Sequence, residues 1–122
     1  MVAFKEMDQH VTLHEQLGEG GGPVVLINVF NVEPQEAERL VAAWGDDAAS
    51  MKRQPGFISA QLHRGVGGSG AFLNYAVWES AEHFRRAFES PDFRAKLGNY
   101  PPSTVASPHL FRKMAVADIC GA

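Results

Sequence analysis

Residues 71–80 read AFLNYAVWES and carry the most informative pattern in the sequence. Their aromatic and apolar residues predict a strand over Ala71–Glu79. Ser80 then predicts the start of a helix over Ala81–Glu89, because a serine side chain can accept a hydrogen bond from the free N–H groups of a first helical turn. The fold therefore contains a strand that leads directly into a helix at this point.

One face of the predicted strand mixes polar and apolar side chains. Alternation along the strand places on that face Phe72, Asn74, Ala76 and Trp78. Asparagine is disfavoured inside a strand and needs a partner where it is buried, and Asn28 shares an apolar face with Leu26 and Phe30. Two amides and an indole N–H in an apolar lining predict anchors for a polar atom of a flat ligand. The alternative is that Trp78 fills the core and that Asn74 makes a local hydrogen bond.

Further elements extend from this segment in both directions. Upstream, the pattern predicts a strand over Val24–Val32, a helix over Gln35–Gln54 and a strand over Phe57–Val66. The helix has an apolar stripe formed by Ala37, Leu40, Val41, Trp44, Ala48 and Met51. Downstream, the pattern predicts a short helix over residues 90–97, a loop rich in proline and serine over Asn99–Pro108 and a strand over His109–Val116. These elements complete the order β-α-β-β-α-β. This order predicts an α+β, ferredoxin-like fold with an antiparallel four-stranded sheet and helices on one face.

The predicted sheet has apolar residues on both faces. In Val24–Val32, one alternating set is Val25, Ile27 and Val29, and the other set is also apolar. Helices cover only one face, so the other would expose apolar surface in a monomer. We therefore expect a homodimer in which the sheets of two copies pack together.

Composition narrows the possible functions. The 122 residues allow one domain, with an arm and glycine-rich joint at 1–22, a body at 23–117 and a tail at 118–122. The arm is compatible with a short strand or a helical turn at its start. The formal net charge of −3 argues against general nucleic-acid binding, and no apolar run approaches the ~20 residues that cross a bilayer. Cys120 has no partner in the chain, so we expect a cytoplasmic protein without disulfides.

Two motifs with known chemistry occur without the context that they need. Residues 65–70 fit the pattern G-x-G-x-x-G, but a strand follows where nucleotide binding requires a helix. We therefore predict a glycine hairpin. His10 and His14 could share a helical face, but no third ligand is organised beside them. We predict no metal site.

The central segment also resembles a known family. Residues 74–80 (NYAVWES) resemble the N-Y-A-x-W-E-S segment of the antibiotic biosynthesis monooxygenase family. Residues 26–30 (LINVF) and 54–59 (QPGFIS) fall where members carry their first strand and a P-G-F turn. The resemblance covers about residues 23–116. It implies the family's dimeric α+β barrel.

Two branches of that family can be compared with this sequence. The cofactor-independent anthrone and quinone-forming monooxygenases use an asparagine, a tryptophan, a tyrosine and an arginine, which map to Asn74, Trp78, Phe84 and Arg94. The tyrosine hydroxyl is therefore missing. The haem-degrading branch uses an asparagine, a tryptophan and a histidine ligand, which map to Asn28, Ala87 and Leu97. Haem iron would have no obvious ligand here, so the resemblance favours the first branch.

The resemblance implies a monooxygenase without cofactor that oxidises an anthrone, phenol or quinol with dioxygen to a quinone. The substrate loses a proton and passes an electron to dioxygen, and recombination followed by loss of water gives the quinone. Asn74 and Trp78 would donate hydrogen bonds to the substrate oxygens, and Arg94 would lower the pKa of the substrate. The groups that bind and enclose the substrate would be Asn28, Phe84, Phe72, Phe30 and Leu26.

Two other functions fit the same fold. The missing hydroxyl at Phe84 favours a protein that binds a small aromatic ligand without oxygen chemistry. A small isomerase or lyase would need a histidine in the pocket, with His63 or His83 as the candidate. Ligand-dependent oxygen consumption separates the monooxygenase from both.

Overall fold

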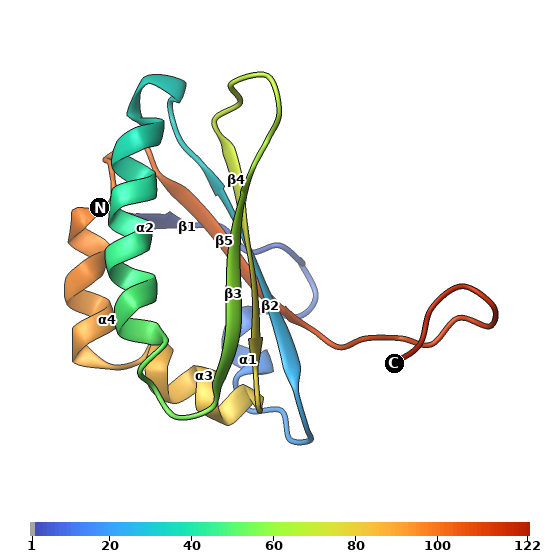
Figure 1. Ribbon diagram of the computed structural model, residues 1–122. Coiled ribbons are helices and arrows are strands. Elements are labelled where there is room, and N and C mark those ends of the chain that lie inside the picture. The colour runs from blue at the N-terminus through green and yellow to red at the C-terminus, as the bar shows by residue number, and fades with distance from the viewer. Residues whose placement is uncertain (1) are drawn as a thin grey trace.

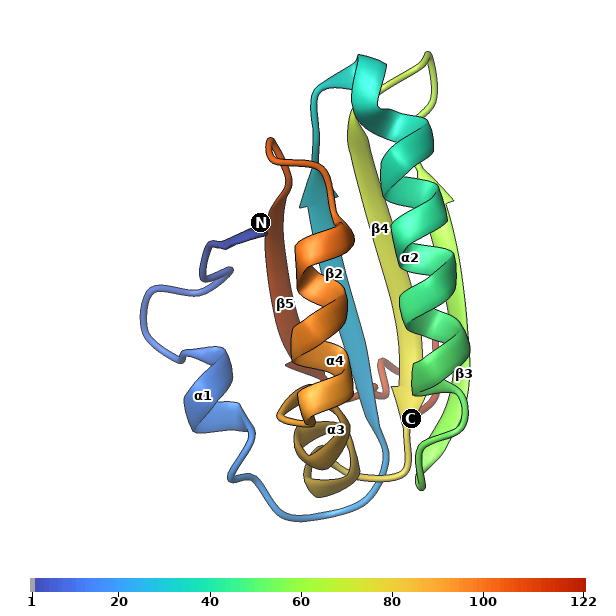
Figure 2. The same ribbon diagram turned by 90° about the vertical axis from the view of Figure 1, so that its left-hand side faces the viewer.

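A mixed β-sheet with helices packed against one face forms the body of the protein (Figure 1). The computed structural model describes residues 2–122. The strands are β1 (Ala3–Phe4), β2 (Val24–Asn31), β3 (Phe57–Arg64), β4 (Ala71–Trp78) and β5 (Val105–Phe111). The helices are α1 (Leu13–Gln16), α2 (Ala37–Met51), α3 (Ala81–Phe88) and α4 (Pro91–Lys96), with 3-10 turns η1 (Pro34–Glu36) and η2 (Leu97–Asn99). In Figure 2, α2, α3 and α4 lie in front of the sheet and α1 lies beyond β5.

The sheet topology agrees with the sequence analysis. The strand order is β1-β5-β2-β4-β3. β2 pairs antiparallel with β4 and β5, and β3 pairs antiparallel with β4. These strands, with the helices on one face, confirm the predicted α+β, ferredoxin-like fold. β1 adds a fifth strand, which runs parallel to β5 at the edge of the sheet.

The last strand begins earlier than predicted. The prolines of residues 99–108 predict a loop before His109, but β5 runs over Val105–Phe111 and contains Pro108. The backbone groups of Ala106 and Leu110 face the β1 side, where they bond Lys5 and the Gln16 side chain. Those of Pro108 face the same side, because the direction alternates along a strand. The missing N–H of proline therefore removes no bond to β2.

The N-terminal segment packs on the body through α1. Thr12 and Glu15 form a capping box at the start of this helix. Leu13 and Leu17 are buried against the core, whereas the glycine-rich joint that follows is exposed. The sequence allowed either a short strand or a helical turn in this segment, and the structure contains both, β1 and α1. Residue 1 lies outside the described residues.

Serine caps start both helices that follow β4. The Ser80 side chain accepts a hydrogen bond from the backbone N–H of His83 (3.1 Å), and the Ser90 side chain accepts one from Phe93 (3.2 Å). Helix α2, with 15 residues, is longer than either. Across residues 2–122, no helix combines the length and the apolar character that crossing a membrane requires.

Gly56 shapes the turn between α2 and β3. Its φ of 87° is a conformation that glycine adopts easily. A Cβ at this position would lie 2.3 Å from a ring carbon of His83, so α3 packs directly on the bare backbone of the turn. Phe57, the next residue, lies edge-on to Trp78, with ring centroids 5.4 Å apart.

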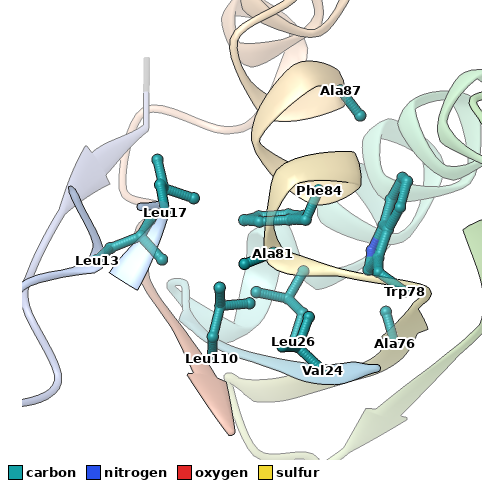
Figure 3. Packing of buried hydrophobic residues seen from close by; sticks show 10 residues of the cluster. All are labelled: Leu13, Leu17, Val24, Leu26, Ala76, Trp78, Ala81, Phe84, Ala87 and Leu110. Carbon is teal, nitrogen blue, oxygen red and sulfur yellow. The ribbon is translucent and has the colours of Figure 1, made fainter. Parts of the chain in front are cut away.

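The buried side chains form two clusters on the helix side of the sheet. Figure 3 shows the first cluster, in which Leu13 and Leu17 extend from α1 towards the sheet and α3, and Trp78 lies beside Phe84. The second cluster is packed under α2 and includes Phe30, Leu40, Phe72 and Tyr100. One member of the predicted α2 stripe is misplaced: Val41 is 45% exposed because it lies at the margin of the buried face.

Candidate active site

A cavity lies between the sheet and the helices. Its sheet wall includes Leu26, Asn28, Phe30, Asn74, Ala76 and Trp78. Its helix wall includes Trp44, Asp47, Met51, Phe84, Phe88 and Phe93. The free volume is about 50 Å³, whereas a cavity of about 150 Å³ accommodates benzene. A ligand with one or more aromatic rings therefore requires the walls to separate.

The sheet wall carries polar atoms without protein partners. The Oδ1 atoms of Asn28 and Asn74 and the Nε1 atom of Trp78 are buried and accept or donate no hydrogen bond within the described chain. Asn28 and Asn74 lie directly opposite each other in the β2–β4 register, so their side chains are neighbours on one face. Trp78 lies four residues beyond Asn74 on the same strand face, roughly 13 Å along the strand. Buried polar groups without partners are typical of ligand sites.

Aromatic rings connect Trp78 to the surface. Trp78 is 1% exposed and makes an edge contact with Phe84, with ring centroids 5.8 Å apart. Phe84 packs against Phe88 at 5.3 Å, and Phe88 packs against Phe93 at 5.0 Å. The last two rings also line a groove of about 330 Å³ between α1 and α4. Phe88 and Phe93 therefore separate the cavity from an open groove.

The helix wall carries a carboxyl group that the sequence analysis missed. Asp47 on α2 is 8% exposed. Its Oδ2 atom accepts a hydrogen bond from the hydroxyl of Tyr100 (2.9 Å), while its Oδ1 atom has no partner in the described chain. Burial raises the pKa of Asp47 to about 6, against the opposing effects of the Tyr100 hydrogen bond and the Lys96 charge. The group therefore titrates near neutral pH.

A sequence signal for Asp47 exists. Leu40, Trp44, Asp47 and Met51 follow one another at intervals of four, three and four residues. This spacing places Asp47 in the middle of the apolar face of α2. A carboxyl group on the buried face of an amphipathic helix is unusual unless it has a partner or a function.

The structure brings most of the predicted site residues to the cavity. Among its lining residues are Asn28, Asn74, Trp78, Phe84, Phe30 and Leu26. Phe72 belongs instead to the second cluster, where it is 2% exposed and its ring lies 5.2 Å from the guanidinium carbon of Arg64. Arg94 lines the outer groove, because its position on α4 faces α1 rather than the sheet. The two residues do not line the cavity.

The histidines lie away from the cavity. His63 is exposed, and its Nδ1 atom lies 3.3 Å from the carbonyl oxygen of Leu73. His83 pairs with the Ser80 hydroxyl at 2.7 Å. The cavity lining contains neither of them, nor any other histidine of residues 2–122. The described residues also contain no cluster of three or more side chains suited to a metal ion.

Comparisons with known proteins agree with this architecture. The family model described as antibiotic biosynthesis monooxygenase matches residues 23–96. The chain is 36% identical over 70 residues to deoxynogalonate monooxygenase of Streptomyces nogalater, a match that covers 57% of this chain and 58%, less than two thirds, of that protein. It is 28% identical over 99 residues to a mycobilin-producing heme oxygenase of Mycobacterium tuberculosis, covering 81% of this chain and 94% of that protein.

A solved structure supports the same relationship. SnoaB, a cofactor-independent oxygenase from Streptomyces nogalater, superimposes with a TM-score of 0.68 at 27% sequence identity. The superposition covers 80% of this chain and 99% of that one.

Proposed function

The chain belongs to the antibiotic biosynthesis monooxygenase family, and we propose that it oxidises an electron-rich aromatic compound with dioxygen to a quinone without a cofactor. The observation that carries this proposal is the cavity in which Asn74 and Trp78 present unpartnered polar atoms within an apolar lining. The similarity to deoxynogalonate monooxygenase and to a cofactor-independent oxygenase supports the same reaction class.

The reaction balances without a flavin or a metal when the substrate is an anthrone. Its methylene carbon loses both hydrogens and gains one oxygen atom, and the second oxygen atom leaves with those hydrogens as water. The carbon gives up four electrons, which dioxygen accepts. The protein must hold the flat substrate away from water and stabilise the oxyanion that forms when the first proton leaves.

The sheet wall supplies the groups for that stabilisation. Trp78 can donate from its indole N–H, which is buried without a protein partner in the described chain. Asn74 can donate from its amide NH₂ group, and its Oδ1 atom is a buried acceptor without a partner in the same part of the chain. Asn28 lies beside Asn74 and can hold a second polar atom of the substrate. Leu26, Phe30 and Phe84 supply apolar surface for the rings. A donor placed in a dry site stabilises developing charge more strongly than the same donor in water.

Access to the cavity depends on the aromatic pair at its rim. Phe88 and Phe93 are only partly buried, and they stand between the cavity and the groove that contains Arg94. Rotation of these rings would join the two spaces. Arg94 then acts on a substrate that approaches through the groove, rather than on the reacting carbon.

Oxygen uptake by protein freed of metal and flavin, with a panel of anthrones and naphthols, tests the proposal. Trp78→Phe removes the indole donor, so uptake should fall by about 10²–10³. Tyr75→Phe is the matched control, because Tyr75 lies on the same strand with its side chain on the opposite face and is 39% exposed. Quinone formation that survives in Trp78→Phe would contradict the assigned role of Trp78.

A binding protein without oxygen chemistry is the second candidate. Phe84, which replaces the family's tyrosine, favours it because the cavity then lacks that hydroxyl. In this case the same naphthols would bind with a measurable affinity, and no oxygen would be consumed with any member of the panel.

Haem degradation fits the cavity poorly, despite the similarity to a heme oxygenase. Asn28 lines the cavity, but Leu97 occupies the position of the histidine ligand and lines the outer groove. The lining offers no histidine to hold iron among the described residues.

Two copies of the chain pair through the outer face of the sheet in this proposal. That face exposes Ile58 (52%), Tyr75 (39%) and Phe111 (41%), and no helix covers it in Figure 1. Light scattering should give twice the chain mass for the native protein and the single mass for an Ile58→Lys/Tyr75→Lys double variant. A native protein that stays monomeric at high concentration would contradict this part.

A further inference from the structure

The proposed reaction needs a group that takes the substrate proton, and the sheet wall has none. Its polar side chains are two amides and an indole, which stay neutral and do not act as bases near neutral pH: Asn28, Asn74 and Trp78. Among the described residues that line the cavity, Asp47 alone is titratable. The helix wall therefore carries the one candidate base among these residues.

The two oxygen atoms of Asp47 have different environments. Oδ2 is held by the Tyr100 hydroxyl at 2.9 Å, and burial raises the pKa of Tyr100 so far that this hydroxyl stays protonated and donates. Oδ1 is buried without a partner in the described chain, on a side chain that lines the cavity. A carboxylate that serves only the structure would use both oxygens, because an unsatisfied buried acceptor destabilises the fold. One oxygen is thus anchored and the other is free to accept a proton.

From this arrangement we infer that Asp47 is the catalytic base, taking the acidic hydrogen of the bound aromatic substrate on its free oxygen, with Tyr100 as its positioning residue. The inference rests on the proposed function, since it assigns the proton transfer with which that reaction begins. A base must be within hydrogen-bond reach of the proton, and a substrate between the two walls meets Asn74 and Trp78 on one side and Asp47 on the other.

The charges around Asp47 suit this role. Tyr100 contacts it directly, Lys96 and Asp92 lie on α4, and Asp46 is its neighbour on α2. Lys96 is paired with Asp46 at 3.1 Å, so its charge is largely compensated. With a pKa of about 6, Asp47 is ionised at neutral pH and is still a stronger base than an exposed carboxylate.

The proton balance closes over one turnover. Asp47 first takes one methylene proton, and the carbanion gives one electron to dioxygen and recombines with the superoxide to a peroxide anion. The protonated Asp47 returns its proton to that anion, which forms a hydroperoxide. Asp47 then takes the second hydrogen of the same carbon as a proton while the O–O bond breaks and the C=O bond forms. The hydroxide that leaves takes this proton and departs as water, which restores the carboxylate.

Anaerobic hydrogen exchange tests the base apart from the oxidation. Anthrone in heavy water exchanges its methylene hydrogens only when a base removes them, and mass spectrometry follows the exchange without oxygen. The native protein should accelerate this exchange, and Asp47→Asn should slow it by about 10²-fold or more, the usual contribution of a general base. Glu38→Gln is the matched control, because Glu38 lies on the same helix but its side chain is exposed and does not line the cavity. It should exchange like the native protein.

Chemical rescue adds a signature that a structural role would not give. Asp47→Gly leaves space beside Tyr100, and added formate should restore exchange in that variant but not in Asp47→Asn. Equal exchange by the native protein and Asp47→Asn, or none by the native protein, would overturn the inference. Exchange that depends on Asp47 without any oxygen uptake would keep Asp47 as a base and reject the monooxygenase. Oxygen uptake that persists in Asp47→Asn would keep the monooxygenase and reject Asp47.

Discussion

The two walls of the cavity differ in the kind of polar group they carry. The sheet wall presents amides and an indole, which can donate or accept hydrogen bonds but keep their charge state. The helix wall presents Asp47, whose charge changes near neutral pH. In the proposed reaction, the sheet wall would bind the oxyanion of the substrate, and Asp47 on the helix wall would take its proton. The pH dependence of this site should therefore come from the helix wall alone.

Removing a donor from the sheet wall should have the largest effect. Asn74→Ala deletes an amide in the middle of the wall, and we expect turnover to fall by about 10²–10³, which corresponds to about 2.7–4 kcal/mol. Steady-state oxygen uptake measures the loss. Asn31→Ala is the control, because Asn31 is exposed at the end of β2. If the variant shifted the pH profile as well, the walls would not act separately.

The free energy of unfolding should depend on pH because of Asp47 on the helix wall. Burial raises the pKa of Asp47 to about 6 in the folded protein, above the ordinary value of 3.8, so the folded protein holds this proton more tightly than the unfolded chain. The associated stability is fully present below about pH 4 and is lost as the pH rises through about 6. It amounts to about 3 kcal/mol.

Asp47→Asn removes that dependence. In urea titrations at pH 4 and pH 8, the native protein should lose about 2–3 kcal/mol relative to the variant over this range. The comparison between the two proteins cancels the contributions of other groups. Parallel stability curves would mean that Asp47 is not perturbed by burial.

A smaller effect is expected from the residue that holds Asp47. The Tyr100 hydrogen bond lowers the pKa of Asp47 against burial, so Tyr100→Phe should move the acid limb of the activity profile upward. The expected shift is roughly one to two pH units, because a hydrogen bond to a charged group contributes about 1.5–3 kcal/mol. Turnover well above that limb should change little. A pH profile that stays in place would show that Tyr100 does not control the base.

The smallest effect should come from the groove outside both walls. Arg94→Ala should change kcat by no more than about twofold, in line with a surface substitution of about 0.5 kcal/mol. A raised KM with an unchanged kcat would agree with guidance of the substrate through the groove. A large fall in kcat would mean that Arg94 reaches the reacting atoms after the rim opens.

The two walls also differ in how well the sequence predicted them. Alternation along a strand is exact, so Asn74 and Trp78 could be placed on one face from residues 71–80 alone. The helix stripe was drawn through apolar residues only, and Asp47 was passed over although its spacing from Leu40 and Met51 puts it on that face. The pairing of Asp47 with Tyr100 spans fifty-three positions, and no local pattern encodes such a contact.

The strand β5 shows a different reason for error. Prolines predicted a loop at 99–108, yet Pro108 fits the strand because its missing N–H faces away from β2. Local propensity cannot reveal which side of a strand is paired. Likewise, the position of Arg94 depends on how α4 packs between the sheet and α1, which follows from tertiary contacts rather than from helix periodicity.

The Gln16 side chain bears on how this protein avoids aggregation. Its amide donates to the carbonyl of Leu110 and accepts from the N–H of Leu110, both at 2.9 Å. An added strand would form the same two hydrogen bonds with Leu110. The Gln16 side chain therefore occupies backbone groups that an open sheet edge would offer to another chain. Proteolytic loss of the segment before Gly18 would remove the Gln16 side chain together with β1. The trimmed protein would then expose the backbone groups of Ala106 and Leu110 at the edge of β5, and Pro108 between them would be the position that offers no N–H to an added strand.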